Sequence, residues 1–243
     1  LPVTALVLTH AHYDHVFGSV VVTHCPDFAH GRDESAARNP EVIVHAHHRL
    51  PEHLREHEEA ELAAGRSGEL VLGDPSLWDD VVLPVPDVLV ATTTTVRPGG
   101  RYLVLEPWPT AHTTCDLVVH VPDAGVWVVG DVVEQSWEPS FKSDSDPVAW
   151  AAALTALATR IGPDDVVVPG HGTVVDRAFV ADQARVMTDL ATTLVRCDDA
   201  GMTDGETVRE LHEVTHLLAT TVRAAVAAHR SAANRTPTDE EHA

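Results

Sequence analysis

The sequence predicts an α+β protein whose β-strands end in histidine and aspartate side chains. Three observations support this prediction. Short apolar runs of strand length alternate with polar turns from residue 3 to residue 168, and long segments with helical spacing follow toward the C-terminus. Residue types that bind metals come directly after several of the apolar runs. A chain of 243 residues with 44% hydrophobic residues is also long enough to build a core.

The first apolar run, residues 3–8, predicts a buried strand that leads directly into the string HAHYDH, with His10, His12, Asp14 and His15. Three imidazoles and a carboxylate at the end of a core strand are costly to desolvate unless a partner satisfies their lone pairs. A divalent metal ion does so, and imidazole with carboxylate is a ligand set that suits zinc. The alternative is a polar loop in a chain that contains 17 histidines.

The segment that follows this motif predicts a series of short elements. Asp14 lies near the N-terminus of a helix predicted at 16–22, where the helix dipole favours a carboxylate. Gly65 is expected to end a second helix, at 51–64. We expect the segment 23–100 to carry an insertion and to contribute a lid or wall over the site. The other predicted features are a polar loop at 24–39, a strand at 41–45 and β-like runs at 81–85 and 88–91.

The rest of the chain predicts strands followed by longer helices. A hairpin is predicted where Pro122-Asp123-Ala124-Gly125 separates two apolar runs. The predicted strands are 101–106, 117–121, 126–129 and 165–168, the predicted helices are 147–160, 177–195 and 207–230, and residues 231–243 predict a frayed end.

Three further polar residues follow predicted strands in the same way, namely His112, Asp131 and His171. Side chains at strand ends can converge from distant positions on a rigid scaffold. Taken alone, His112 could be an ordinary histidine and Asp131 a turn residue. Packing does not explain His171, which lies between Gly170 and Gly172, because glycine lets the backbone approach another group closely.

The remaining histidines and tryptophans receive a structural interpretation. Trp108, Trp137 and Trp150 are expected to be packing residues, with Trp137 as the best exception, because it follows Asp131 in a predicted loop and is a candidate substrate contact. The sequence identifies no other substrate-binding residue. The histidines that we interpret as solvated are His45, His47, His48, His53, His57, His212 and His216, with His47 and His48 as alternative candidates for the mouth of the site.

With these motifs in this order, the sequence resembles the metallo-β-lactamase-fold hydrolases. The matching motifs are HAHYDH, then Ala111-His112-Thr113, Gly130-Asp131 and Pro169-Gly170-His171-Gly172. The resemblance implies a site for two metal ions that share a bridging water or hydroxide. By resemblance, one ion is held by His10, His12 and His112, the other by Asp14, His15 and His171, and Asp131 bridges the two.

The resemblance also implies the type of site. His15 stands where class B1 lactamases carry arginine, which favours a two-metal site of the glyoxalase II, lactonase or B3-lactamase kind. Asp116 stands where glyoxalase II-like enzymes have glycine, which weakens that particular assignment. Cys115 is not expected to be a ligand, because the implied set is complete without it. The implied cofactor is two zinc ions per chain, with iron or manganese in place of zinc as the second possibility.

The implied fold is a four-layer αβ/βα sandwich. We expect a hydrolase domain at residues 1–200, a C-terminal helical extension at 201–232 and a frayed tail at 233–243. Only one strand precedes the first motif where the family has several, so N-terminal strands of the fold are expected to be missing. The apolar stripe at 207–230 is expected to pack on the sandwich or across a homodimer interface rather than in the active site.

The implied chemistry is hydrolysis by a metal-bound hydroxide. Zinc lowers the pKa of a bound water toward neutrality and polarises a carbonyl group. Asp14 is expected to orient the nucleophile or to shuttle its proton. We therefore predict a zinc-dependent hydrolase of an acyl bond in a small ester, thioester, lactone or lactam. The competing predictions are a phosphodiesterase or nuclease of the same fold and an iron-loaded redox protein.

The charge and the cysteines restrict the partners. A formal net charge of -21 argues against nucleic acid and against anionic membrane surfaces, and no apolar run approaches the ~20 residues of a membrane span. The three cysteines, Cys25, Cys115 and Cys197, form no disulfide framework and are typical of a reducing cytoplasm. We expect a cytoplasmic protein with a small-molecule substrate that is neutral or carries a localised charge.

Overall fold

The structure, a computed structural model, describes residues 3–24, 42–69 and 74–235. Its contacts divide the chain into two compact units. The first unit comprises Leu1–Pro107 and Cys115–Asp123, and the second comprises Trp108–Thr114 and Ala124–Ala243. The domain boundaries predicted at residues 200 and 232 stay a prediction.

The first unit contains a parallel sheet in the order β1-β2-β3. Its strands are β1 (Ala5–Leu8), β2 (Ile43–His47) and β3 (Val88–Val90). Leu8 lies opposite Ala46, and Ala46 lies opposite Leu89. The strands predicted at 3–8 and 41–45 are thereby confirmed, the second with a shift of two residues. The apolar run at 81–85 is not a strand, which corrects that prediction.

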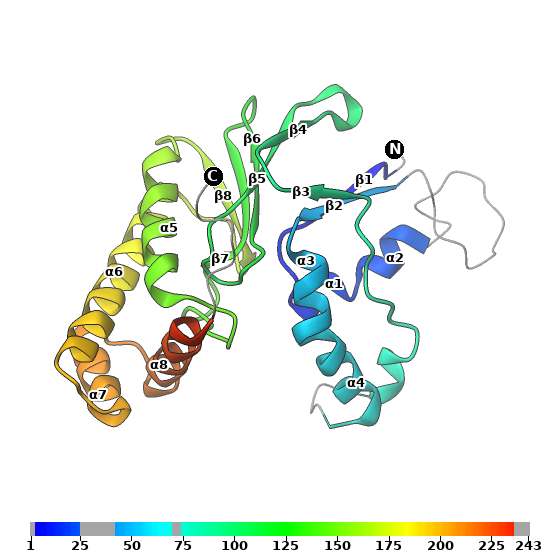
Figure 1. Cartoon of the computed structure of the whole chain (residues 1–243). Coiled ribbons are helices and arrows are strands. Elements are labelled where there is room, and N and C mark those ends of the chain that lie inside the picture. The colour runs from blue at the N-terminus through cyan, green and yellow to red at the C-terminus, as the bar shows by residue number, and fades with distance from the viewer. Residues whose placement is uncertain (1–2, 25–41, 70–73, 236–243) are drawn as a thin grey trace. The chain divides into compact units, whose positions relative to one another are not determined.

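Helices of the first unit pack on this sheet (Figure 1). The helix predicted at 51–64 is present, but it continues past Gly65 to a left-handed Gly68 with φ 76°. Gly65 lies inside the helix because the Trp78 ring packs against it, and an added Cβ would lie 2.5 Å from Trp78. The helices are α1 (Tyr13–Val16), α2 (Ser19–His24), α3 (Leu50–His53), the π-helix η2 (Leu54–Glu58), α4 (Glu59–Ser67) and the 3-10 helix η3 (Pro75–Trp78).

The segment 23–100 forms strands and helices in its described part, and the insertion expected within it stays a prediction. It supplies β2, β3 and the helices between them, so it builds the body of the first unit. Its expected role as a lid stays a prediction, and most of the loop predicted at 24–39 lies outside the described residues. The unit is completed by an antiparallel ribbon of β4 (Thr94–Val96), β5 (Leu103–Pro107) and β6 (Leu117–Val121), with the 3-10 helix η4 (Pro98–Gly100) between β4 and β5.

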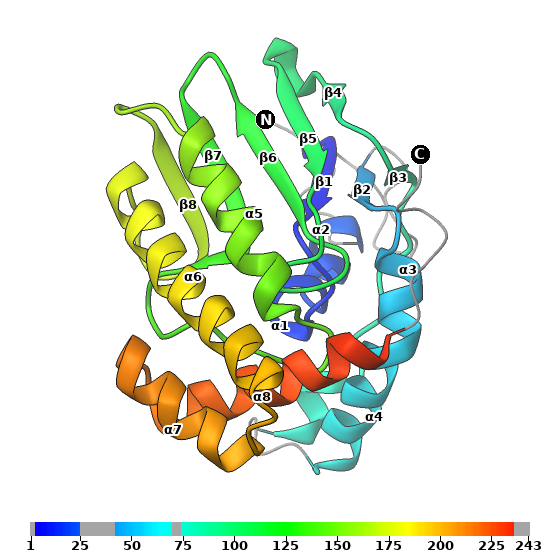
Figure 2. The same cartoon turned by 60° about the vertical axis from the view of Figure 1, so that its left-hand side comes forward.

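The second unit is built on two parallel strands, β7 (Val126–Glu134) and β8 (Val166–His171). Helices α5 (Pro147–Arg160) and α6 (Arg177–Asp199) lie side by side (Figures 1 and 2). Helix α5 has the predicted bounds because Asp146 accepts hydrogen bonds from the first backbone N–H groups and Pro147 fits the first turn. The fully buried side chains of this unit include Trp150, Leu154, Leu157, Met187, Leu190 and Leu194.

The single helix predicted at 207–230 is two helices, α7 (Asp204–Thr215) and α8 (Ala219–Asn234). The chain breaks at His216, which adopts a left-handed conformation with φ 59°. Helix α8 continues to Asn234, so residues 231–234 are helical rather than frayed, and residues 236–243 lie outside the described part. Asp198 at the end of α6 accepts hydrogen bonds from His229 and Arg230 of α8, which ties these helices together.

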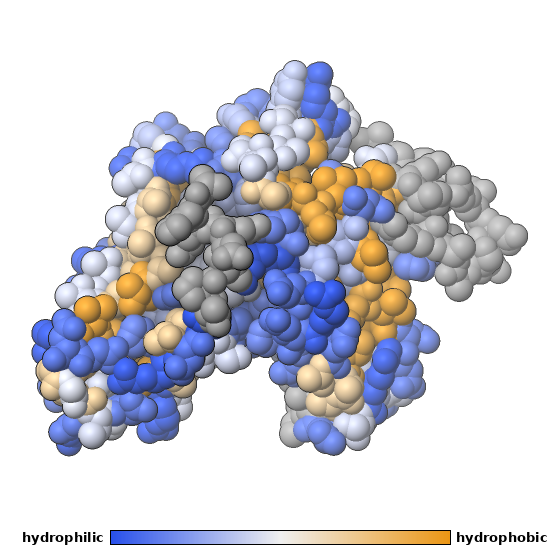
Figure 3. All heavy atoms as spheres, viewed as in Figure 1, coloured by the Kyte–Doolittle hydropathy of each residue, from blue (hydrophilic) through white to orange (hydrophobic). Residues whose placement is uncertain are grey.

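The surface is mostly hydrophilic on the face in Figure 3, with apolar side chains gathered over β3 and the segment that leads into it. Val82, Val85 and Leu89 are exposed there, with fractions of 58%, 76% and 50%. None of the helices in the described ranges combines the length and apolar composition that crossing a membrane requires.

Candidate metal centre

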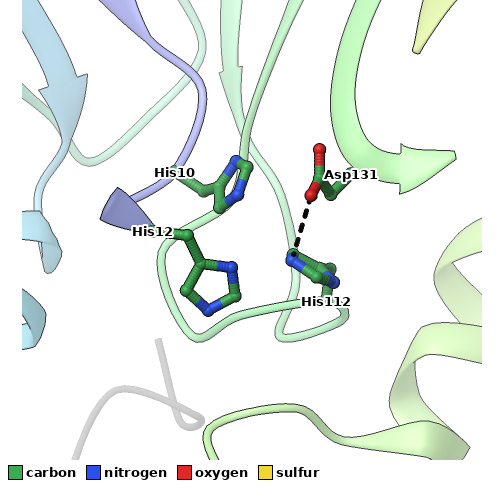
Figure 4. Close-up of side chains that lie close together, drawn as sticks. All are labelled: His10, His12, His112 and Asp131. Carbon is green, nitrogen blue, oxygen red and sulfur yellow. Dashed lines mark ion pairs between the residues drawn. The ribbon is translucent and has the colours of Figure 1, made fainter. Parts of the chain in front are cut away.

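The first unit holds four of the sequence-predicted ligands in one turn of chain. Strand β1 ends at Leu8, and α1 begins at Tyr13, so the motif spans the junction between them. His10 and His12 are only 1% and 3% exposed, and their rings lie 5.0 Å apart at 86° (Figure 4). The ring of His15 lies 4.1 Å from that of His10.

Asp14 and His15 lie on the more open side of the same turn. The Asp14 carboxylate is 3.6 Å from the His15 ring nitrogen Nε2, and the two side chains are 34% and 14% exposed. The backbone N–H of His15 donates to the carbonyl of His12 at 2.9 Å, which begins the helical turn. Burial and the carboxylates of Asp14, Glu61 and Glu58 raise the pKa of Tyr13, so its phenol stays neutral at pH 7.

The second unit holds the other three predicted ligands, His112, Asp131 and His171, and the two imidazoles lie beside the buried carboxylate of Asp131. Oδ2 of Asp131 lies 3.6 Å from Nε2 of His112 and 3.3 Å from Nε2 of His171. Figure 4 marks the contact of Asp131 with His112. Asp131 is 4% and His112 1% exposed, whereas the His171 side chain is 38% exposed. A carboxylate at this depth is stable only with charged or hydrogen-bonding partners, and here two imidazoles approach it.

Asp131 does not follow its strand, as predicted, but lies within β7. The pairing of β7 with β8 shifts register between Val128 and Gly130 and again before Glu134, and Gly130 has a φ of 55°. Such irregularities bend a strand and redirect its side chains. The sequence predicts that the strand ends at Val129, because the apolar run ends there. The register shifts that extend the strand past Asp131 depend on its pairing with β8.

The two glycines beside His171 have the predicted role of allowing close approach. A Cβ on Gly170 would collide with Oδ1 of Asp131. A Cβ on Gly172 would collide with the side-chain oxygen of Gln135, and Gly172 also has a φ of 94°. The Gln135 oxygen accepts a hydrogen bond from the backbone N–H of Thr173 at 2.9 Å. The absence of side chains at both positions therefore lets the end of β8 lie against β7.

His112 is held through its backbone and its ring. The hydroxyl of Ser145, which is fully buried, donates to the carbonyl of His112 at 2.7 Å. The backbone N–H of Asp146 donates to the carbonyl of Ala111 at 3.1 Å. The ring of His112 lies edge-on to Trp150, with centroids 5.1 Å apart. The start of α5 thus positions this ligand.

Several residues outside the predicted ligand set differ from expectation. His45, His47 and His53 are buried, with exposures of 7%, 4% and 2%, so their interpretation as solvated is wrong. They lie on β2 and α3, which the sequence pattern alone does not mark as core. Burial, with the charges of His48 and Arg49, lowers the pKa of His47 to about 3.

Other expectations hold or stay open. Cys115 is fully buried in the hydrophobic core of the first unit, in keeping with a structural role. Trp108 and Trp150 are buried packing residues, as predicted. Trp137 is 81% exposed, and its contact with substrate stays a prediction.

Two residues near the motif were missed by the sequence reasoning. His53 and Glu58 lie close to His12, and a ligand atom from each of the three lies within 4.8 Å of the others. All three side chains are buried. A spacing of five residues in a helical segment does not bring side chains to one face of an α-helix, so no pattern in the sequence pointed to this pair.

The donor atoms of both units fit a divalent metal. The first unit offers three imidazoles and a carboxylate, and the second offers two imidazoles and a carboxylate. These are nitrogen and oxygen donors of the kind that zinc prefers. The burial of four of these donors, His10, His12, His112 and Asp131, is unusual for titratable side chains unless they serve a site.

Comparisons with known proteins show the family and the fold. The family described as the metallo-beta-lactamase superfamily matches residues 1–171. The comparison with curated proteins gives no match. Among solved structures, the stereoselective inverting sec-alkylsulfatase Pisa1 from Pseudomonas sp. matches with a TM-score of 0.69 and 21% identity, over 98% of this chain and 43% of that chain.

Two other structures match over larger shares of their own length. A beta-lactamase domain protein from Burkholderia ambifaria has a TM-score of 0.63 and 21% identity, over 96% of this chain and 68% of that chain. A metallo-beta-lactamase from Pontibacter korlensis has a TM-score of 0.56 and 22% identity, over 78% and 71%. The chain thus spans less than half of the alkylsulfatase, and identities at this level show the fold alone. The family match over residues 1–171, on a fold shared with these structures, means that this chain belongs to the metallo-beta-lactamase superfamily.

Proposed function

We propose that this protein is a zinc-dependent hydrolase that cleaves an acyl bond in a small molecule. Membership of the metallo-beta-lactamase superfamily supports a hydrolase. The observation that carries the proposal is the buried Asp131 carboxylate, which lies 3.6 Å and 3.3 Å from the rings of His112 and His171. A buried carboxylate between two imidazoles is the arrangement expected of a metal ligand that two ions share. A purely structural role does not require this arrangement.

The proposed ligand set combines the groups held by the two units. One zinc ion would be held by His10, His12 and His112, the other by Asp14, His15 and His171, and Asp131 would bridge them. The compact grouping of His10, His12 and His15 in the first unit supports this assignment. So does the glycine at position 170, which keeps the space beside the Asp131 carboxylate open.

The residues of the chain divide the chemistry among them. Bound zinc supplies a water that ionises near neutral pH and a Lewis acid for the scissile carbonyl. The histidines hold their rings in fixed orientations, since most of them are buried. Asp14, with a side chain that is 34% exposed and close to His15, is placed to accept or release a proton at its carboxylate.

A second candidate reaction is the hydrolysis of a sulfate ester. An alkylsulfatase is among the solved structures that match, over 98% of this chain, and a beta-lactamase domain protein matches over 96%. These shares do not separate the two reactions, so the sulfate ester enters the test as a candidate outside the acyl class. The net charge of -21 disfavours a nuclease, because a polyanion would be repelled.

The test is a substrate panel with zinc-loaded protein. It includes an ester, a thioester, a lactone, a lactam, a secondary alkyl sulfate and bis-p-nitrophenyl phosphate. We expect hydrolysis of at least one acyl substrate, lost by several orders of magnitude on chelation and in His12→Ala. Cleavage of the sulfate or of the phosphodiester with no acyl turnover would replace the proposal by that reaction.

Metal analysis tests the ligand assignment separately. We expect two zinc ions per chain and a larger loss of metal in Asp131→Ala than in Cys115→Ala, because Cys115 lies in the hydrophobic core. Equal metal content in the two variants would contradict the assignment. Iron in protein made without added metal would favour a redox protein.

We also propose a reducing compartment such as the cytoplasm. The odd number and wide spacing of the three cysteines, which form no disulfide framework, support this proposal.

A further inference from the structure

A buried cluster of three residues lies beside the metal motif within the first unit. A ring nitrogen of His12, a ring nitrogen of His53 and a carboxylate oxygen of Glu58 lie within 4.8 Å of one another. The rings of His12 and His53 are 6.0 Å apart at 65°. Exposures of 3%, 2% and 1% place all three side chains in the interior. The proposed reaction uses neither His53 nor Glu58.

The sheet explains how the cluster forms. Strands β1 and β2 are parallel neighbours, so their carboxyl ends lie at the same edge. The first strand leads to His12, and the second leads to α3, which carries His53. Leu50 and Leu54 are buried in the core of this unit and anchor the helical segment on the sheet. The side chain of His53, between them in sequence, is thereby directed to the motif.

The π-helix η2 places Glu58 beside His53. In an α-helix, residues five apart are separated by about 140° around the axis, because each residue adds about 100°. In η2 the backbone N–H of Glu59 donates to the carbonyl of Leu54, five residues earlier. This wider turn brings residues five apart to one side of the helix. Such π-turns are rare and occur frequently at functional sites.

A buried glutamate is expensive to keep in a protein interior, so its position calls for a purpose. Metal-binding histidines usually donate their second ring N–H to a carboxylate or another acceptor, which fixes the tautomer and the ring orientation. His12 is in the proposed ligand set, and Glu58 is the carboxylate grouped with it in the first unit.

We propose that Glu58 and His53 are positioning residues that hold the ring of His12 in the orientation and tautomer required for metal binding. This inference rests on the proposed function, because it requires His12 to be a ligand. The carboxylate of Glu58 and the ring of His53 act through His12 and do not contact the substrate. The π-turn of η2 is the structural device that brings them there.

The test compares Glu58→Gln with Glu59→Gln. Both variants remove one negative charge from adjacent positions, but Glu59 is exposed and Glu58 is buried. Competition with a chromogenic chelator should show zinc affinity about 10- to 100-fold weaker in Glu58→Gln and unchanged in Glu59→Gln. In cobalt-substituted protein, the visible absorption bands should shift only in Glu58→Gln. Glu58→Asp, which keeps the carboxylate, should recover part of the affinity.

The outcomes separate this inference from the proposed function. His12→Ala should lose metal outright, and a failure to do so would overturn the proposed site itself. If His12→Ala loses metal but Glu58→Gln keeps wild-type affinity and the wild-type cobalt spectrum, only the positioning role is wrong. Loss of one full equivalent of metal in Glu58→Gln, with the remaining metal bound at wild-type affinity, would also overturn it, because Glu58 would then be a ligand. If Glu58→Gln fails to fold, the same comparison is made with His53→Gln, in which wild-type zinc affinity and a wild-type cobalt spectrum would overturn the positioning role.

Discussion

A few small residues decide how closely the polar side chains of the site can approach the backbone. Gly170 and Gly172 leave room for Asp131 and Gln135, where any larger residue would collide. The buried histidines have an equally local role. His47 accepts a hydrogen bond from the backbone N–H of Arg49 at 3.1 Å and is neutral at physiological pH.

We expect Gly170→Ala to lower metal content and to destabilise the protein by about 1–3 kcal/mol, because the added methyl group overpacks the space beside Asp131. Zinc content and thermal unfolding measure the two effects. Gly205→Ala is the matched control, since a Cβ there meets no atom within 4 Å. Unchanged metal content in Gly170→Ala would mean that Asp131 can move without loss of bound metal.

We expect His47 to make the protein less stable as the pH falls. Its pKa is lowered from 6.5 to about 3 by burial and by the charges of His48 and Arg49, so the unfolded chain takes up a proton first. Stability from the neutral ring is therefore complete above pH 6.5 and is lost as the pH falls toward 3. The slope contributed by this residue approaches about 1.4 kcal/mol per pH unit.

The measurement is denaturant unfolding of wild type and His47→Asn across this pH range. Asparagine keeps an acceptor for the Arg49 N–H but does not titrate. The variant should show the shallower slope. His216→Asn, at an exposed left-handed position that asparagine tolerates, is the control for the exchange of histidine for asparagine. Equal slopes in wild type and His47→Asn would contradict the prediction.

At the scale of elements, the C-terminal helices support the loop that carries His112. Arg235, just after α8, donates to the carbonyls of Ser143 and Ser145 at 2.7 Å and 3.0 Å. The Ser145 hydroxyl donates to the carbonyl of His112 and accepts from the backbone N–H of Lys142. A continuous series of hydrogen bonds therefore links the end of α8 to a proposed metal ligand inside the second unit.

We expect Ser145→Ala to destabilise the protein by about 1–3 kcal/mol, because the buried His112 carbonyl and the Lys142 N–H each lose this partner. Zinc affinity should fall as well, since His112 is held less firmly. Thermal unfolding and chelator competition check both effects. Ser143→Ala, at an exposed position two residues away, is the control. Equal behaviour of the two variants would mean that this link does not support His112.

For the molecule as a whole, the dominant physical property is the net charge of -21. Self-repulsion of this size opposes a compact state, and salt screens it. The same charge favours small substrates over polyanions. It acts on the chain independently of the arrangement of the site.

We therefore expect the melting temperature of the metal-free protein to rise when sodium chloride is increased from about 0.01 M to about 0.15 M, since the Debye length shortens to about 8 Å. Differential scanning calorimetry measures this shift. A falling melting temperature would mean that ion pairs such as Arg230 with Asp198 outweigh the general repulsion.

Local patterns in the sequence were enough to predict the family, most of the strands and the residue types of the proposed site. The reason is that apolar periodicity and the strings around His10, His112 and His171 are local patterns. Such patterns place a polar motif at the end of a strand without reference to the rest of the chain. The bounds of α5 were predictable for the same reason, because its cap and its first-turn proline are adjacent in sequence.

The fold was needed for features that depend on a partner distant in sequence. Asp131 lies inside β7 because the pairing with β8 shifts register there. His47 and His53 are buried because β2 lies between two parallel strands and α3 packs on them, although both residues look solvated in sequence. Glu58 meets His12 only because η2 winds as a π-helix, and a spacing of five residues carries no signal of that turn.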